Sequence, residues 1–157
     1  MTNPPVHIVL LSPKIPNNTG NIGRTAAATG ARLHIVHPIG FDMSTKALRR
    51  AGLDYWHLVD WREHESWEAF LETEQPERLW LYTTKSDRPH WDAAFARGDY
   101  LLFGDEISGV SPEIHEWVTQ TYSEDHRITL PMRAEARSLN LATAVCAAVY
   151  EVLRQIE

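Results

Sequence analysis

Short apolar runs rich in β-branched residues recur along this chain, and each stops abruptly in proline, glycine or small polar residues. The first run, residues 6–11, is apolar at nearly every position and ends at Ser12-Pro13. A strand that is apolar on both faces is typical of a parallel sheet covered by helices on both sides. This feature constrains the chain to an α/β architecture more strongly than any other in the sequence.

Six such runs are expected to be strands, namely residues 6–11, 32–36, 55–59, 78–82, 100–103 and 127–130. Helical patterns separate them at about 18–29, 46–51, 67–72, 111–118 and 141–156. Asn18 or Thr19 would cap the first helix and Gly30 would close it, while Ser111 with Pro112 is a typical helix start. The second helix would be capped by Ser44 or Thr45 and end at Gly52.

The alternation of strand and helix from end to end predicts one α/β domain covering residues 1–157. We expect a mostly parallel six-stranded sheet with helices on both faces. A chain of 157 residues with 43% hydrophobic content is long enough for one full core, and a second domain would have little room.

The expected cell compartment follows from the targeting and membrane-spanning patterns that the sequence does not show. The N-terminus carries no basic region followed by an apolar run, and no apolar stretch approaches the roughly 18 residues of a membrane span. Cys146 is the single cysteine, so it cannot form an internal disulfide, and its Ala/Val surroundings predict a buried thiol. We therefore expect a cytoplasmic protein without a membrane partner.

The net charge of −6 is unusual for a nucleic-acid-binding protein, which ordinarily carries an excess of Lys and Arg. The basic residues are unevenly distributed, however, and residues 63–77 are largely acidic. A local basic face on an acidic protein therefore stays open. The basic positions that could form it are Arg24, Arg32, Lys46, Arg49, Arg50, Lys85, Arg88, Arg133 and Arg137.

Two segments predict a ligand pocket. Residues 101–109 and 128–140 each begin as an apolar strand and pass into Gly, Pro, Ser and Asn. Strand ends of this kind present main-chain N–H and C=O groups to a ligand at the carboxyl edge of a parallel sheet. The two segments together are expected to form one site.

The segment Gly20-Asn21-Ile22-Gly23 allows several interpretations. It could be a phosphate loop at a helix N-terminus, a tight turn with a helix cap, or a GXXG loop of the KH type. Neither the GxGxxG pattern of dinucleotide-binding proteins nor the GxxxxGK[ST] pattern of nucleoside triphosphatases is present. A dehydrogenase or a P-loop enzyme therefore has no motif in its favour.

No metal site is expected. His34 and His37 are three residues apart, but they straddle a strand end and should face different ways. The chain has one cysteine and no second cluster of ligands. Trp56 and Trp91 could stack on a base, although tryptophans more often fill a core or an interface.

Three ordered motifs resemble those of the SPOUT superfamily of RNA methyltransferases. They are NNTGNIGR (17–24), LLFGDEISG (101–109) and ITLPMRAEARSLNLATAV (128–145). LRRAGLDY (48–55), TTK (83–85) and PM…RSLNL resemble more closely the tRNA 2′-O-methyltransferases that act on the wobble cytidine or uridine, at position 34 of the anticodon loop. The resemblance extends over essentially the whole chain.

This resemblance implies a trefoil knot in the C-terminal part of the sheet, where S-adenosylmethionine binds and leaves as S-adenosylhomocysteine. It implies no metal cofactor. The cofactor residues it assigns are Tyr82, Thr83, Gly104, Leu130, Met132, Ser138, Leu139 and Asn140.

The resemblance also implies that Arg24 is the catalytic arginine and that Asn21, Glu106 and Asn140 shape the site. Two roles stay open for Arg24: a base tuned by its surroundings, or a clamp on a neighbouring phosphate. The second is attractive because guanidinium groups hold their proton. Arg24, Arg49, Arg50 and Lys85 are the expected RNA contacts.

The implied partners are a tRNA anticodon stem-loop and a second copy of the chain, with the last helix and the first-motif helix meeting across the dimer interface. Asp105 and Glu106 make the second motif more acidic than is usual for a loop that faces RNA. The sequence therefore leaves open whether the preferred substrate nucleotide is cytidine or modified uridine. Two alternatives also remain: a knotted RNA-binding protein without independent catalysis, and 2′-O-methylation of another tRNA or rRNA position.

Overall fold

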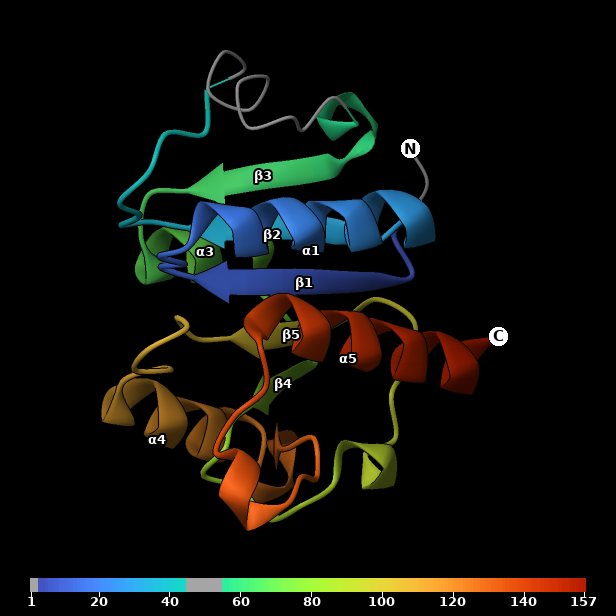
Figure 1. Cartoon of the computed structure of the whole chain (residues 1–157). Helices are drawn as coiled ribbons and strands as arrows, with labels where there is room; N and C mark the ends of the chain where they lie inside the picture. Colours follow the sequence, from blue (N-terminus) through green and yellow to red (C-terminus); the bar gives the residue numbers. More distant parts are fainter. Residues whose placement is uncertain (1–2, 45–54) are drawn as a thin grey trace.

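A six-stranded sheet forms the centre of the computed structural model, which describes residues 3–44 and 55–157 (Figure 1). Its strands lie in the order β3-β2-β1-β5-β4-β6, and every neighbouring pair is parallel. The prediction of a mostly parallel six-stranded sheet is confirmed. The strands are β1 (Val6–Leu11), β2 (Arg32–Val36), β3 (Asp60–His64), β4 (Leu79–Tyr82), β5 (Asp99–Phe103) and β6 (Arg127–Ile128).

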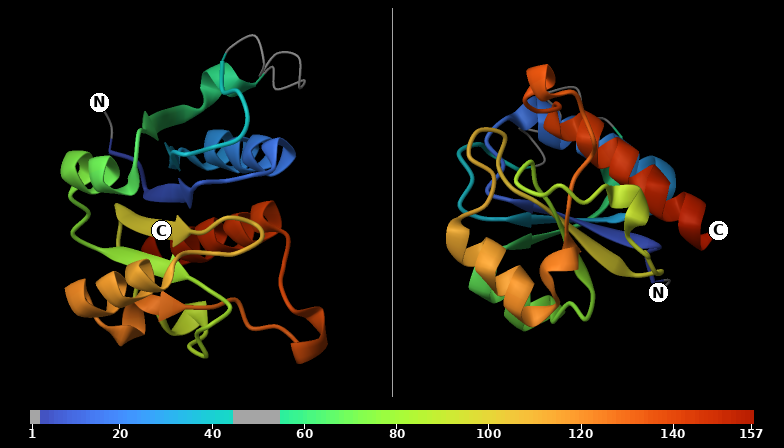
Figure 2. Two further views of the ribbon diagram at one scale, coloured as in Figure 1. Left: turned by 90° about the vertical axis from the view of Figure 1, so that its left-hand side faces the viewer. Right: turned by 90° about the horizontal axis from the view of Figure 1, so that it is seen from below.

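Helices cover both faces of the sheet, so the molecule is a three-layer α/β domain (Figure 2). On one face lie α1 (Pro16–Thr29) and α5 (Leu141–Ile156), and on the other α3 (Trp67–Glu74) and α4 (Pro112–Thr121). Short 3₁₀ helices complete the described elements: η1 (Trp56–Leu58), η2 (His90–Asp92), η3 (Glu124–His126) and η4 (Ala134–Ala136).

The apolar runs are explained by burial on both sides of the central strands. Ile8 and Leu10 of β1 pack in the core under α1 and α5, whereas Val9 packs in the core under α3 and α4. All three side chains are fully buried. Removing such surface from water contributes about 25 cal/mol per Å², so each apolar position in β1 stabilises one of two cores.

The third strand was predicted wrongly at residues 55–59. Residues 56–58 form η1, and the strand follows as β3. An apolar residue stands at position 56 because the Trp56 ring packs on α1, so closely that a Cβ added to Gly23 would lie 2.2 Å from the ring. Trp56 is thus a buried core residue rather than a base-stacking candidate, whereas Trp91 is 55% exposed.

Helix ends agree with the predictions in part. Gly30 closes α1 with a φ of 80°, as expected, but the helix begins at Pro16, so Asn18 and Thr19 lie inside its first turns and do not cap it. Ser111 is the N-cap of α4, although its hydroxyl makes no capping hydrogen bond. The helix expected at 46–51 lies outside the described residues, as do Thr45 and Gly52, whereas Ser44 is described and its hydroxyl donates to Asp42 Oδ2 at 2.9 Å.

The C-terminal helix α5 buries Val145, Val149 and Val152 along one stripe, and Ile156 at its end is partly buried. Cys146, which we expected to be buried, is only partly so, because its position falls beside that stripe. Within residues 3–44 and 55–157, no helix combines the length and the apolar character needed to cross a bilayer.

Candidate active site

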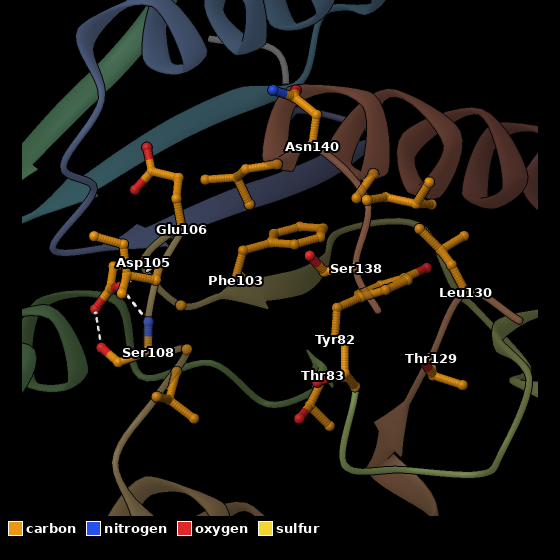
Figure 3. A pocket seen from close by; sticks show the side chains of 18 of the residues that line it. Tyr82, Thr83, Phe103, Asp105, Glu106, Ser108, Thr129, Leu130, Ser138 and Asn140 are labelled. Atoms are coloured by element: carbon orange, nitrogen blue, oxygen red, sulfur yellow. Dashed lines mark hydrogen bonds between the residues drawn. The ribbon is translucent and has the colours of Figure 1, made fainter. Parts of the chain in front are cut away.

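A pocket of about 530 Å³ opens where β4, β5 and β6 end, at the carboxyl edge of the sheet (Figure 3). All the residues that the family resemblance assigns to the cofactor line it: Tyr82, Thr83, Gly104, Leu130, Met132, Ser138, Leu139 and Asn140. Lys85 and Glu106 line it too. The two segments expected to form one site are therefore brought together, although 101–109 and 128–140 are far apart in sequence.

One wall of the pocket is the turn that follows β5. Asp105 and Gly109 exchange main-chain hydrogen bonds, with N···O distances of 3.3 and 3.2 Å. This folds Gly109 over Gly104 so closely that a Cβ on Gly104 would lie 2.2 Å from the Gly109 carbonyl carbon. The two segments that meet here are both main chain, which cannot move aside at low energetic cost. The position of residue 104 therefore requires a glycine.

Asp105 holds this turn from within. Its carboxylate accepts hydrogen bonds from the main-chain N–H groups of Ile107 and Ser108 at 2.8 and 2.7 Å, and from the Ser108 hydroxyl at 2.7 Å. Burial raises the pKa of Asp105, but the hydrogen bonds from Ser108 and Ile107 outweigh it and the net pKa is lowered. The acidity of the second motif at this position is therefore structural.

Glu106 ties the same turn to the start of α1. Its two carboxylate oxygens accept the main-chain N–H groups of Lys14 and Ile15 at 2.8 and 2.9 Å. These groups lie at the N-terminal end of α1, where N–H donors lack partners within the helix and negative charge is favoured. Glu106 thus positions two loops against each other instead of presenting a free carboxylate to RNA.

Asn18 is a site residue that the sequence analysis treated only as a helix cap. Its side chain accepts a hydrogen bond from Asn140 Nδ2 at 3.1 Å and donates one to Glu106 Oε2 at 3.3 Å. Asn140 in turn caps α5 by accepting the N–H of Thr143 at 3.2 Å. Residues of all three motifs therefore meet at the Asn18 amide. The one sequence signal that could have identified Asn18 was its position within the first motif.

The inner side of the pocket is aromatic. The Tyr82 ring stacks on Phe103, with centroids 4.9 Å apart (Figure 3). The Tyr82 hydroxyl lies 2.9 Å from His90 Nδ1. Burial raises the pKa of Tyr82 and lowers the pKa of His90, so both groups are neutral near pH 7. Because the Tyr82 hydroxyl is engaged with His90, what this wall offers a ligand is mainly apolar surface.

The opposite rim carries positive charge. His115 lines the pocket together with Lys85, and Arg127 donates from Nε to His115 Nδ1 at 3.1 Å. Burial, and then the charges of Arg127 and Lys85, lower the pKa of His115. The imidazole is therefore a neutral acceptor between two cations, and the rim favours an anionic ligand such as a phosphate.

Two of the expected catalytic residues lie elsewhere. Arg24 and Asn21 are exposed on α1 and are not among the described residues that line the pocket. The Arg24 guanidinium lies over the Tyr55 ring, 4.4 Å from its centroid, and the Tyr55 hydroxyl donates to the Gly20 carbonyl. Within one chain the structure unites Glu106 and Asn140 but leaves the arginine outside. Arg49 and Arg50 lie outside the described residues.

The histidines considered for a metal also separate. His34 is fully buried in β2, whereas His37 follows the strand and contacts Glu63 with an N···O distance of 2.7 Å. The prediction that these two side chains face different ways is confirmed.

Comparison with known proteins agrees with the pocket and the sheet. The SpoU rRNA Methylase family matches residues 5–150. The chain belongs to this family. SpoU methylases are enzymes, so the pocket at the carboxyl edge lies in a methyltransferase fold.

Curated relatives cover nearly the same length. The chain is 45% identical over 150 residues to a tRNA (cytidine(34)-2′-O)-methyltransferase of Saccharophagus degradans, covering 96% of this chain and 95% of that one. It is 44% identical over 151 residues to the corresponding enzyme of Escherichia coli K12, covering 96% and 94%.

Solved structures show the same architecture. A structure concerned with the 2-OH methylation of C/U34 on tRNA superposes with a TM-score of 0.83 at 44% identity, covering 96% of this SpoU chain and 95% of that chain. AviRb from Streptomyces viridochromogenes in complex with AdoMet superposes with a TM-score of 0.74 at 26% identity, covering 99% and 62%.

Proposed function

We propose that this SpoU-family protein transfers the methyl group of S-adenosylmethionine to the ribose 2′-hydroxyl of nucleotide 34, cytidine or uridine, in the tRNA anticodon loop. The observation that carries the proposal is one pocket, lined by every residue that the family resemblance assigns to the cofactor. The full-length similarity to tRNA (cytidine(34)-2′-O)-methyltransferases supports the substrate.

The pocket suits this cofactor in size and chemistry. Its volume of about 530 Å³ lies within the roughly 300–1,000 Å³ typical of small-molecule sites. Tyr82 and Phe103 offer apolar surface, while the turn at Gly104 and the segment around Ser138 bring main-chain groups to the wall. S-adenosylmethionine supplies an electrophilic methyl group and a sulfide leaving group, so the transfer requires no metal ion.

The protein's own task is to position the hydroxyl and accept its proton. The ribose oxygen forms a bond to the methyl carbon as the carbon–sulfur bond breaks, giving S-adenosylhomocysteine and a proton. Holding the two reactants in line is worth several kcal/mol by itself. Lys85, which lines the pocket, is suited to hold a phosphate next to the target ribose. The family resemblance assigns RNA contacts to Arg24, Arg49 and Arg50 as well.

Arg24 would complete the site in a homodimer. It lies on α1, outside the pocket of its own chain, and α1 lies next to α5 on one face of the molecule (Figure 1). In the proposed dimer these two helices form the interface, so that Arg24 and Asn21 of one subunit face the pocket of the other. A fully active monomer, shown by light scattering at assay concentration, would contradict this arrangement.

Arg24→Ala tests the catalytic role. We expect calorimetry to show unchanged affinity for S-adenosylmethionine and activity assays to show a loss of at least about 100-fold, as for other groups that stabilise a transition state. Arg97→Ala is the matched control, because Arg97 is also an exposed arginine but pairs with Glu157 at another edge. Turnover close to that of the unmodified protein would remove Arg24 from the mechanism.

Mapping the product tests the substrate. The protein is incubated with total tRNA and labelled S-adenosylmethionine, and the methylated nucleotide is located by mass spectrometry. Label on the ribose of nucleotide 34 is expected, and label elsewhere would indicate another tRNA position. No label, with a thermal shift by neither S-adenosylmethionine nor S-adenosylhomocysteine, would favour an RNA-binding protein without catalysis.

We also propose that the C-terminal segment is threaded as a trefoil knot and that the protein works in the cytoplasm. The segment after β6 supports the threading. Thr129 donates its N–H to the Arg88 carbonyl at 2.9 Å and accepts that of His90 at 2.8 Å, and the chain then returns to the pocket and α5. Covalent joining of the termini would trap the knot, and the denatured circle should migrate faster in a gel than an unknotted circle.

A further inference from the structure

A second cluster of polar side chains lies near the amino ends of the strands, away from the cofactor pocket. His7 of β1, His34 of β2 and Glu74 at the end of α3 converge on the face covered by α3 and α4. One potential ligand atom from each lies within 4.8 Å of the other two. His7 is 7% exposed, His34 is fully buried and the Glu74 side chain is 5% exposed.

We propose that His7, His34 and Glu74 form a binding site for a divalent transition-metal ion of the zinc type. Two imidazoles and one carboxylate, with one position left for water, are a ligand set that zinc uses in proteins. The methyl-transfer chemistry proposed above does not involve these residues, so the two proposals stand or fall separately.

The spacing suits a metal ion after a small adjustment. His7 Nδ1 lies 2.9 Å from His34 Nε2, which lies 3.9 Å from Glu74 Oε1. Zinc–ligand bonds of about 2.0–2.2 Å in a tetrahedron place neighbouring ligand atoms about 3.3–3.6 Å apart. These two distances bracket that value, and the third pair, His7 and Glu74, lies within 4.8 Å, so side-chain shifts of up to about an ångström would bring the ligands into place.

The ligands are held by outer partners, as in known metal sites. His34 Nδ1 lies 2.9 Å from His64 Nε2, which fixes the ring that presents Nε2 to the metal position. Tyr100 donates its hydroxyl to Glu74 Oε1 at 2.8 Å, and the same tyrosine ring stacks on His7 with centroids 3.9 Å apart. These contacts hold the three ligands toward one point.

Positive charge near the site lowers its affinity for a metal ion, but the Glu74 carboxylate can still act as a ligand. Arg62 Nη1 lies 3.0 Å from Glu74 Oε2, so the second carboxylate oxygen, Oε1, is the one that faces His34. An ionised carboxylate has about four acceptor positions, so Oε1 can accept from Tyr100 and still bind a metal. Two further arginines lie near the site: Arg32 pairs with Asp60 at 2.9 Å, and Arg97 lies 3.8 Å from Glu157.

An access path is present. A cavity of about 450 Å³ is lined by His7, Glu74 and Tyr100, by the arginines Arg32 and Arg97, and by neighbouring residues around the amino ends of β1 and β5. It provides a route for the ion and a place for the water that would occupy the fourth position. A metal here would join β1, β2 and α3 at one point, which is a stabilising role.

Titration of chelator-treated full-length protein with Zn²⁺ and Co²⁺ tests the site. We expect one equivalent to bind, to raise the melting temperature, and to give the visible absorption of four-coordinate Co²⁺. His7→Asn and Glu74→Gln should abolish both signals. His64→Asn, which removes only the outer partner of His34, should weaken binding about 10- to 100-fold.

His37→Asn is the matched control, because His37 and Glu63 are an exposed histidine–carboxylate pair that could bind metal instead. Retained binding in this variant supports the buried site, and lost binding overturns it. Unchanged binding in Glu74→Gln, or no binding by the unmodified protein, also overturns it. Each variant is checked for folding by its thermal shift with S-adenosylhomocysteine, and X-ray absorption on the unmodified Zn²⁺ protein should count two imidazoles.

Discussion

The two polar regions of this sheet are built in opposite ways. At the carboxyl edge, the turn around Gly104 and the segment at Ser138 surround an open pocket, and their side chains bond within their own turn or to the start of α1. In the buried region, His7, His34 and His64 lie within the sheet and contact each other at 2.9 Å. Loops leaving a parallel sheet can present free groups to a ligand, whereas a polar side chain inside the core must find a partner there.

Acidification should distinguish the two regions most strongly, because it destabilises the region of the buried histidines. Burial lowers the pKa of His7 to about 4, and burial together with the charges of its neighbours lowers the pKa of His34 further. The unfolded chain, with histidine pKa values near 6.5, then binds more protons than the folded one. Stability is complete above about pH 6.5 and falls on acidification by up to about 1.4 kcal/mol per pH unit for each such histidine.

Urea unfolding in the presence of chelator at pH 7.5, 6 and 5 measures this effect. His7→Asn should flatten the pH dependence, since it removes one of the titrating groups. Equal stability at pH 7.5 and 5 would show that the buried histidines do not govern acid sensitivity.

Gly104→Ala should damage the pocket region alone. The added Cβ would lie 2.2 Å from the Gly109 backbone, so the turn must open, at a cost of about 1–3 kcal/mol typical of overpacking. We expect calorimetry to detect no binding of S-adenosylhomocysteine. Gly40→Ala is the control, because no atom lies within 4 Å of a Cβ there, and unchanged cofactor affinity in Gly104→Ala would contradict the close-approach argument.

Glu106→Gln should give a smaller effect. The amide keeps one acceptor oxygen, so either the Lys14 or the Ile15 N–H loses its partner, at a cost of about 1–3 kcal/mol. We expect a lowered melting temperature and weaker cofactor binding. Glu113→Gln, at an exposed glutamate in the first turn of α4, is the control. Equal melting temperatures for the two variants would mean that Glu106 is not a structural link.

The parts of the fold that sequence predicts are those with a local physical cause. Residues 6–11 and 100–103 are apolar because both faces of β1 and β5 are buried, and Gly30 ends α1 because it adopts a positive φ. Residues 55–59 have the composition of a strand, but the apolar residue Trp56 is there because its ring fills the space over Gly23. This is a contact across the fold, and no local pattern reveals it.

The same distinction holds for the sites. Glycine, proline and small residues at strand ends indicated a ligand pocket, and the residues that the family resemblance assigns to the cofactor line the pocket that the structure forms there. The link between Asn18 and Asn140 joins residues 122 positions apart, and the contact of His7 with His34 joins residues 27 positions apart. Spacing in sequence carries no signal for such pairs, which is why only His34 and His37, three residues apart, were considered for a metal.

The amide of Asn18 has a consequence for how the protein is made. It belongs to the first helix, yet the groups it holds come from the turn after β5 and from the cap of the last helix. During synthesis the N-terminal half of the chain emerges long before Asn140 does, so a growing chain has no complete pocket until its final helix has docked. Under the proposed function, binding of S-adenosylmethionine would require that the last helix has been made and has docked.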